Sequence, residues 1–144
     1  MLSAGSKAPS FPGLAEILSR GPVLLVFYKI SCPTCQYTLP FLERIVKGQL
    51  PMVAISQDDV DGTRRFQSRF GLTMPSLLDR EEEGYPASNA FGIEYVPSLF
   101  LVEPDGTISL ASESFVKAGL ESIALRAALP IFRADESVPA WKAG

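Results

Sequence analysis

The chain has 144 residues, of which 47% are hydrophobic and 20% charged, and this length and composition predict one globular domain with a proper core. The net charge of -3 is not the basic excess of a nucleic-acid-binding protein, and no apolar run approaches the roughly 18–20 residues of a membrane span. With no histidine and two cysteines, the chain has no His-based catalytic triad and cannot by itself supply a four-ligand zinc site.

The first part of the chain shows a helix, a strand and a second helix. After an extended lead-in, residues 13–19 predict a short helix. The continuous apolar run 23–28 is typical of a central strand that is covered on both faces of a parallel sheet. Residues 33–47 have the spacing of an amphipathic helix, with Pro33 in its first turn and Pro40 inside it, where we expect a kink.

The rest of the chain predicts more strands and helices. We expect a strand at 52–56, then an acidic turn at 58–62 that caps a helix ending at Gly71. A short strand at 76–78, a solvated loop at 81–84 and a brief helix at 87–91 follow. The last elements are a strand at 98–103, a tight turn at 104–106 with an antiparallel partner strand at 107–110, and a helix at 117–129. This order predicts an α/β fold with a central mixed sheet and helices on both faces.

We expect one domain over residues 1–144, with its core at about 8–130 and a C-terminal tail at 131–144. The tail is rich in proline, alanine and charged residues and contains one aromatic residue, Trp141. Trp141 either packs on the core, which we favour, or anchors a partner.

Both cysteines lie in the stretch Cys32-Pro33-Thr34-Cys35, between the apolar strand and the amphipathic helix. At a helix start, unpaired backbone N–H groups and the helix dipole favour an anionic sulfur, and the thiolate is the nucleophile in disulfide exchange. Cys35 is one turn further on, close enough to attack a mixed disulfide formed by Cys32. We therefore predict Cys32 as the nucleophile and Cys35 as the resolving thiol.

Three other interpretations of the cysteines compete with this one: a structural disulfide, half of a metal site shared between two chains, and inert buried thiols. A disulfide across so short a loop removes little chain entropy, and nothing else in the sequence indicates a metal site. The intervening Pro33 and Thr34 carry no charge, so we expect a reduction potential in the broad range of about −270 to −180 mV.

Two separated stretches resemble the thioredoxin superfamily: Val26-Phe27-Tyr28 with Cys32-Pro33-Thr34-Cys35 and Pro40, and Val96-Pro97 followed by the strand 98–103 and Pro104-Asp105-Gly106. The chain is most similar to the redoxin branch of bacterial thiol–disulfide oxidoreductases (AhpC/TSA–thioredoxin-like), and the resemblance covers roughly residues 8–130. It implies a thioredoxin-like fold.

The resemblance also implies a peptide-docking face. Pro97 would be a cis proline facing the cysteines, and Val96 would offer backbone groups to an extended substrate segment, with Pro33 and Thr34 beside it. The alternative is a trans proline that opens an edge strand.

The chain departs from the family pattern at the buried acid. Many thioredoxins have an Asp six residues before the first cysteine, where this chain has Val26. Some extracytoplasmic relatives instead have a Glu three residues after the second cysteine, where this chain has Thr38. Lys29, Tyr37 or solvent could take over the proton transfer to the second thiol.

Three functions compete. The leading one is a thiol–disulfide oxidoreductase that acts on protein disulfides. The second is a peroxiredoxin-like thiol peroxidase, although the Thr and Pro of that motif are replaced here by Lys29 and Leu25. The third is a non-enzymatic redox-gated binding module. The missing acid and the tail around Trp141 are the features that favour this hypothesis.

We expect the Cys32–Cys35 pair to be the redox group, with no further cofactor and no metal. The expected partners are protein thiols or disulfides and a redox partner protein, and we expect the chain to be a monomer. Residues 1–7 contain no apolar signal segment, so the sequence as given favours the cytoplasm. If a leader was removed, a role outside the cytoplasm becomes the expectation.

Overall fold

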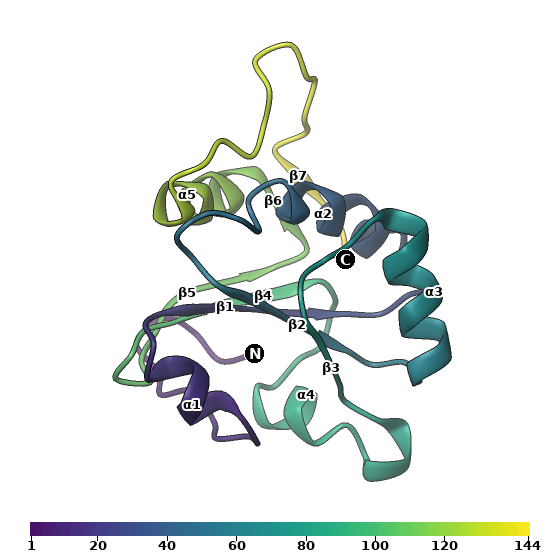
Figure 1. Ribbon diagram of the computed structural model, residues 1–144, viewed down its shortest axis with the longest axis vertical. Helices are drawn as coiled ribbons and strands as arrows, with labels where there is room; N and C mark the ends of the chain where they lie inside the picture. Colours follow the sequence, from purple (N-terminus) through teal and green to yellow (C-terminus); the bar gives the residue numbers. More distant parts are fainter.

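A five-stranded sheet lies at the centre of the computed structural model, which describes residues 1–144 (Figure 1). Its strands stand in the order β3 (Ser76–Leu78), β2 (Met52–Ser56), β1 (Val23–Tyr28), β4 (Ser98–Val102) and β5 (Ile108–Glu113). Strands β1, β2 and β3 run parallel, whereas β4 pairs antiparallel with both β1 and β5. The predicted mixed sheet is therefore confirmed.

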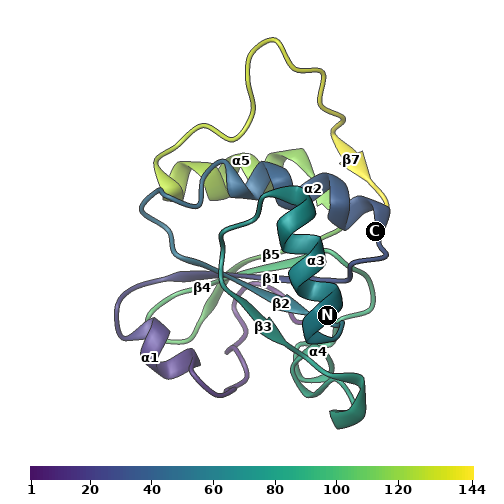
Figure 2. The ribbon, with the colours of Figure 1, turned by 45° about the vertical axis from the view of Figure 1, so that its right-hand side comes forward.

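Helices cover both faces of this sheet, as the sequence predicted. Helices α2 (Pro33–Glu43), α3 (Val60–Phe70) and α5 (Lys117–Ala127) lie on one side, and α1 (Leu14–Leu18) and α4 (Pro86–Ala90) lie on the other (Figure 2). A single turn of 3-10 helix, η1 (Glu81–Glu83), precedes α4 in the predicted solvated loop, and its side chains are exposed. None of the helices is both long and apolar enough to cross a bilayer.

Strand β1 separates two hydrophobic clusters, because its side chains alternate between the two faces of the sheet. Leu24, Val26 and Tyr28 belong to the larger cluster, which includes core residues of α2, α3 and α5. Val23, Leu25 and Phe27 belong to a smaller cluster that includes Leu14 and Phe91. All six side chains are at most 1% exposed, which fixes the strand that leads into the cysteines.

Helix α2 is shorter than the sequence predicted. It continues past Pro40 and ends at Glu43 rather than at Lys47. Beyond it, the backbone N–H groups of Arg44, Ile45 and Val46 each donate to the carbonyl three residues earlier, so the last part of the predicted helix is a run of tight turns.

Two short strands were not predicted. β6 (Phe115–Val116) follows β5 after a single residue, Ser114, and β7 (Trp141–Lys142) pairs with β6 antiparallel. The segment after α5 also contributes to the larger hydrophobic cluster, with Ile131 3% exposed and Phe132 and Val138 packed against it. Trp141, by contrast, is 60% exposed, so the prediction that it packs on the core is wrong.

Candidate active site

Cys32 lies between β1 and α2, at the N-cap position of the helix. Its backbone is extended, with φ −84° and ψ 116°, and Pro33 takes the first helical position, where its missing N–H costs nothing. The backbone N–H of Cys35 donates to the Cys32 sulfur over 3.1 Å. The sulfur thus receives a helix-start hydrogen bond that becomes stronger when the sulfur is charged.

Cys35 differs from Cys32 in its access to water. Cys32 is partly exposed, whereas Cys35 is 0% exposed, and both are free thiols in the structure. Burial raises the pKa of the Cys35 thiol far above its ordinary value, and its hydrogen bond with Cys32 raises the pKa further. Cys32 is therefore the thiol that an outside disulfide can reach, and Cys35 is held protonated behind it.

The loop before β4 brings Val96 and Pro97 to the same place. The Cys32 thiol donates to the Val96 carbonyl oxygen over 3.4 Å, across 64 residues of sequence. The Val96–Pro97 peptide bond is cis, the geometry that the family resemblance implied, and Pro97 itself is buried. Val96 thus lies beside the predicted nucleophile, and its role in binding substrate stays a prediction.

The two residues between the cysteines are placed differently. Pro33 is exposed, while Thr34 is 7% exposed. The Thr34 hydroxyl donates to the carbonyl of Ala143, near the C-terminal end of the chain. The predicted binding residues therefore surround Cys32, but one of them already has a partner within the chain.

No carboxylate stands at either family position for the buried acid. Val26 and Thr38 are both fully buried, and the Thr38 hydroxyl donates to the Thr34 carbonyl over 2.7 Å. Of the two substitutes considered from the sequence, Lys29 is exposed to solvent and Tyr37 packs its ring against Phe41 and Phe115.

Asp58, in the loop after β2, is the acid that the sequence reading missed. Its carboxylate accepts the backbone N–H of Ile30 over 2.7 Å and so holds the loop that leads to Cys32. Its charge is also among the causes that raise the pKa of Cys35, after burial and Cys32. Because β1 and β2 run parallel, their carboxyl ends lie together, and this rule could have placed Asp58 near the cysteines. Asp59 caps α3 as predicted, accepting from the Gly62 N–H.

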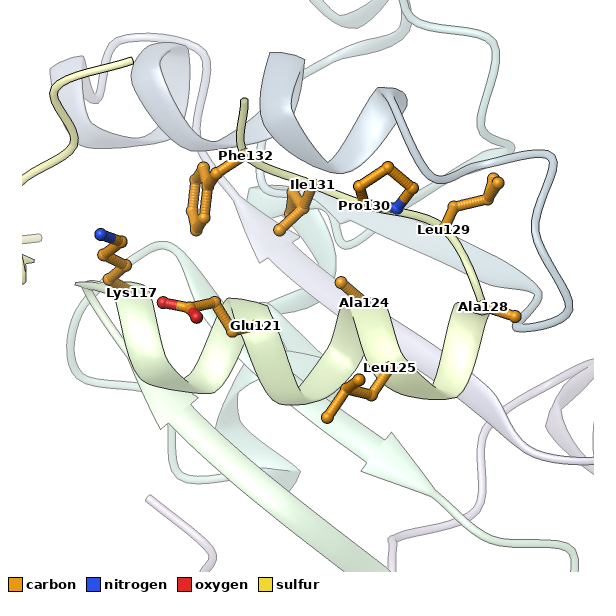
Figure 3. A pocket seen from close by; sticks show the side chains of 9 residues that line it. All are labelled: Lys117, Glu121, Ala124, Leu125, Ala128, Leu129, Pro130, Ile131 and Phe132. Atoms are coloured by element: carbon orange, nitrogen blue, oxygen red, sulfur yellow. The ribbon is translucent and has the colours of Figure 1, made fainter. Parts of the chain in front are cut away.

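A shallow groove of about 540 Å³ lies elsewhere, between α5 and residues 128–132 (Figure 3). Its floor is mostly apolar, with Leu125 at one edge and Phe132 at the other, and Lys117 and Glu121 at one end. Neither cysteine lines it, so the thiol chemistry belongs to the Cys32 site and not to this groove.

Residues 13–111 match the AhpC/TSA family. A thiol-disulfide oxidoreductase ResA of Geobacillus thermodenitrificans is 26% identical over 141 residues, covering 85% of this chain and 79% of the relative. A second ResA, of Halalkalibacterium halodurans, is 30% identical over 100 residues, covering 66% of this chain and 54% of the relative.

Among solved structures, the thioredoxin domain of a thiol-disulfide oxidoreductase from Bacteroides vulgatus has a TM-score of 0.74 at 18% sequence identity, covering 88% of this chain and 98% of that domain. At this identity the likeness is one of fold, and it agrees with the predicted thioredoxin-like fold.

Proposed function

This chain belongs to the AhpC/TSA family, and we propose from this premise that it is a thiol–disulfide oxidoreductase that exchanges disulfides with protein substrates through Cys32 and Cys35. The ResA relatives support oxidoreductase activity of this kind. The observation that carries the proposal is the asymmetry of the two thiols, since Cys32 accepts a hydrogen bond at an accessible helix start while Cys35 is fully buried one turn behind it.

The first step is attack of the Cys32 thiolate on one sulfur of a substrate disulfide. The substrate S–S bond breaks, a mixed disulfide forms between the Cys32 sulfur and the substrate, and the leaving sulfur takes a proton from solvent. The N–H of Cys35 stabilises the charged sulfur before the attack.

In the second step Cys35 gives up its proton to solvent and its sulfur attacks the Cys32 sulfur. The mixed disulfide breaks, Cys32 and Cys35 become a disulfide, and the second substrate thiol leaves, so two electrons pass from the pair to the substrate. The reverse sequence oxidises a dithiol, and a redox partner protein returns the pair to its starting state. Because burial raises the pKa of Cys35, little of this thiol is thiolate at neutral pH, and the second step depends on its deprotonation.

An extended substrate segment would dock along the loop of Val96 and Pro97, with hydrogen bonds to the Val96 backbone and contact with the exposed Pro33. The short distance between the Cys32 sulfur and the Val96 carbonyl supports this placement. A peptide held there has its own sulfur next to Cys32.

The peroxidase alternative has less support. In the peroxiredoxin pattern a Thr stands three residues before the nucleophilic cysteine, and Lys29, which is exposed, stands there in this chain. The position seven residues before Cys32 is Leu25, a buried side chain of β1. Neither side chain offers the hydroxyl that the pattern uses to orient a peroxide.

The test is a redox titration of the full chain in glutathione buffers, followed by the mass of the alkylated protein. We expect one reversible two-electron transition between about −270 and −180 mV, which Cys35→Ser abolishes because it removes the second sulfur. A pair that never cycles would leave the redox-gated binding module as the better account. Faster oxidation by hydrogen peroxide than by a peptide disulfide would favour the peroxidase.

A further inference from the structure

Residues 141–144 lie across the face of the site where a substrate segment is expected to dock. The carbonyl of Ala143 accepts the Thr34 hydroxyl, between the two cysteines. Gly144 lies so near Val96 that a Cβ atom on it would be 2.5 Å from the Val96 carbonyl oxygen. The same Val96 oxygen accepts the hydrogen bond from the Cys32 thiol, so residues 141–144 end beside the predicted nucleophile.

The segment lies there as a strand. β7 pairs antiparallel with β6, and next to this pair the backbone N–H of Lys117 donates to the Ala140 carbonyl over 3.0 Å. At the other end the Gly144 N–H donates to the Ser114 hydroxyl over 2.9 Å. Figure 1 and Figure 2 both show β7 leading to the start of α2. An extended peptide that adds to a strand edge is one of the common ways in which proteins bind peptides.

The tail is attached firmly at its base. Phe132 packs on the ring of Phe41, with centroids 5.1 Å apart. The Arg44 guanidinium donates two hydrogen bonds of 2.7 Å to the Glu136 carboxylate. Residues 139–144, by contrast, are all exposed. An exposed strand of two residues beyond a packed base can lift from the body without unfolding the core.

We propose that residues 139–144 form an intramolecular competitor that occupies the peptide-docking face beside Cys32 and leaves it when an extended substrate segment binds. The inference rests on the proposed function for the identity of the substrate, and on the contacts of Thr34, Val96 and Ser114 for the competition. When a site is open only part of the time, its apparent affinity for a ligand is the affinity of the open site multiplied by the fraction of time that the site is open.

The experiment compares the full chain with a variant that lacks residues 139–144 and with Gly144→Ala, which keeps the full length but cannot keep the close approach to Val96. Asp135→Ala, at an exposed position in the tail, is the matched control. The readout is the rate at which reduced Cys32 reacts with a peptide disulfide and with the small reagent iodoacetamide. We expect both competitor variants to react about fivefold faster with the peptide than the full chain, a factor that corresponds to a face open about one fifth of the time.

The iodoacetamide rate separates competition from a change in the thiol itself. We expect it to change less than about twofold in all variants, because a small reagent needs little of the docking face. Equal acceleration of both reagents, or no acceleration in either variant, would overturn the proposal. A slower peptide reaction would also overturn it, since residues 139–144 would then help to bind the substrate.

Trp141 is the single tryptophan and lies in β7, so its fluorescence anisotropy reports whether the strand is held. We expect the anisotropy of a Cys32→Ser protein to fall when a peptide without cysteine saturates the face. This readout needs no disulfide exchange, so it tests the competitor even if the proposed oxidoreductase activity fails. An unchanged anisotropy at saturating peptide would contradict the proposal.

Discussion

Cys32 and Cys35 are one helical turn apart, yet they have different surroundings. Cys32 meets solvent and the Val96 carbonyl, while Cys35 is enclosed by the larger hydrophobic cluster. The two positions at which relatives carry a buried acid are occupied here by uncharged, buried side chains, Val26 and Thr38. The Asp58 carboxylate, which holds the Ile30 N–H, is then the acid whose charge acts on Cys35.

Asp58→Asn tests this influence, because the amide keeps an oxygen for the Ile30 N–H and removes the charge. Burial keeps the pKa of Cys35 raised, but without the negative charge we expect a lower pKa than in the parent protein. The measurement is the pH dependence of Cys35 alkylation in a Cys32→Ser background, with and without Asp58→Asn. Asp59→Asn, at the α3 cap, is the control. A pH midpoint of Cys35 alkylation that is unchanged or raised in Asp58→Asn would show that the Asp58 charge does not raise the pKa of Cys35.

At the scale of elements, the base of the tail is tied to α2 and the turn after it. The Phe41, Phe115 and Phe132 rings pack together, with centroid distances between 5.1 and 6.2 Å. Beside them the Arg44 guanidinium pairs with the Glu136 carboxylate and also donates to the Ile131 carbonyl. These contacts fix the base of the tail at the C-terminal end of α2, whereas residues 143 and 144 reach the N-terminal end, where the cysteines lie.

The ion pair predicts a pH dependence of stability. Hydrogen bonds from Arg44 lower the pKa of Glu136 from 4.5 to about 2 in the folded chain. The folded state therefore gains from the pair above about pH 4.5 and loses this gain as the pH falls toward 2. We expect Glu136→Gln to melt at a lower temperature than the parent at pH 7 and at the same temperature near pH 2.

Thermal melts of both proteins across this range check the prediction. Glu94→Gln, at an exposed glutamate outside the tail, is the matched control and should melt with the parent protein at pH 7. A difference between Glu136→Gln and the parent that persists unchanged at pH 2 would show that the ion pair is not its source.

At the scale of the whole molecule, the two hydrophobic clusters differ in whether they contain a cysteine of the site. The larger one encloses Cys35, whereas the smaller one lies across the sheet and is built around the rings of Phe27, Phe91 and Phe100. The smaller cluster contains neither thiol, and Val96, which packs against both clusters, is its link to the site.

Phe91→Ala tests this separation. Phe91 is 0% exposed, so we expect a loss of ~3–5 kcal/mol in the free energy of unfolding, measured by urea denaturation. The rate of Cys32 alkylation in the folded protein should stay within about twofold, because both cysteines pack in the larger cluster and neither in the smaller one. Leu125→Ala, at an 83% exposed position, should change stability by less than ~0.5 kcal/mol. A changed alkylation rate in folded Phe91→Ala would show that the smaller cluster shapes the site.

Much of this architecture follows from local patterns in the sequence. The apolar run of β1 and the Cys32–Cys35 spacing predict a buried strand followed by a helix that starts at the cysteines, and the structure has both. The pairing of the cysteines with Val96 came from the family resemblance, since 64 residues separate Val96 from Cys32.

Other features depend on contacts that no local pattern carries. β7 has two residues, and it is a strand because β6 lies beside it, so its sequence has no periodicity to detect. Trp141 was expected in the core on its hydrophobicity, but it is 60% exposed and its backbone pairs with Val116. Asp58 looked like a turn residue, and its place beside the cysteines follows from the parallel pairing of β1 with β2.

The central claim is that Cys32 attacks and Cys35 resolves, and trapping with a peptide disulfide tests it most directly. Cys35→Ser and Cys32→Ser proteins are each mixed with the peptide, and the covalent adduct is measured by mass spectrometry. The account predicts that Cys35→Ser accumulates a one-to-one adduct on Cys32, since no second sulfur can release it, while Cys32→Ser leaves the buried Cys35 almost unmodified. Equal adducts on both variants, or none on Cys35→Ser, would contradict it.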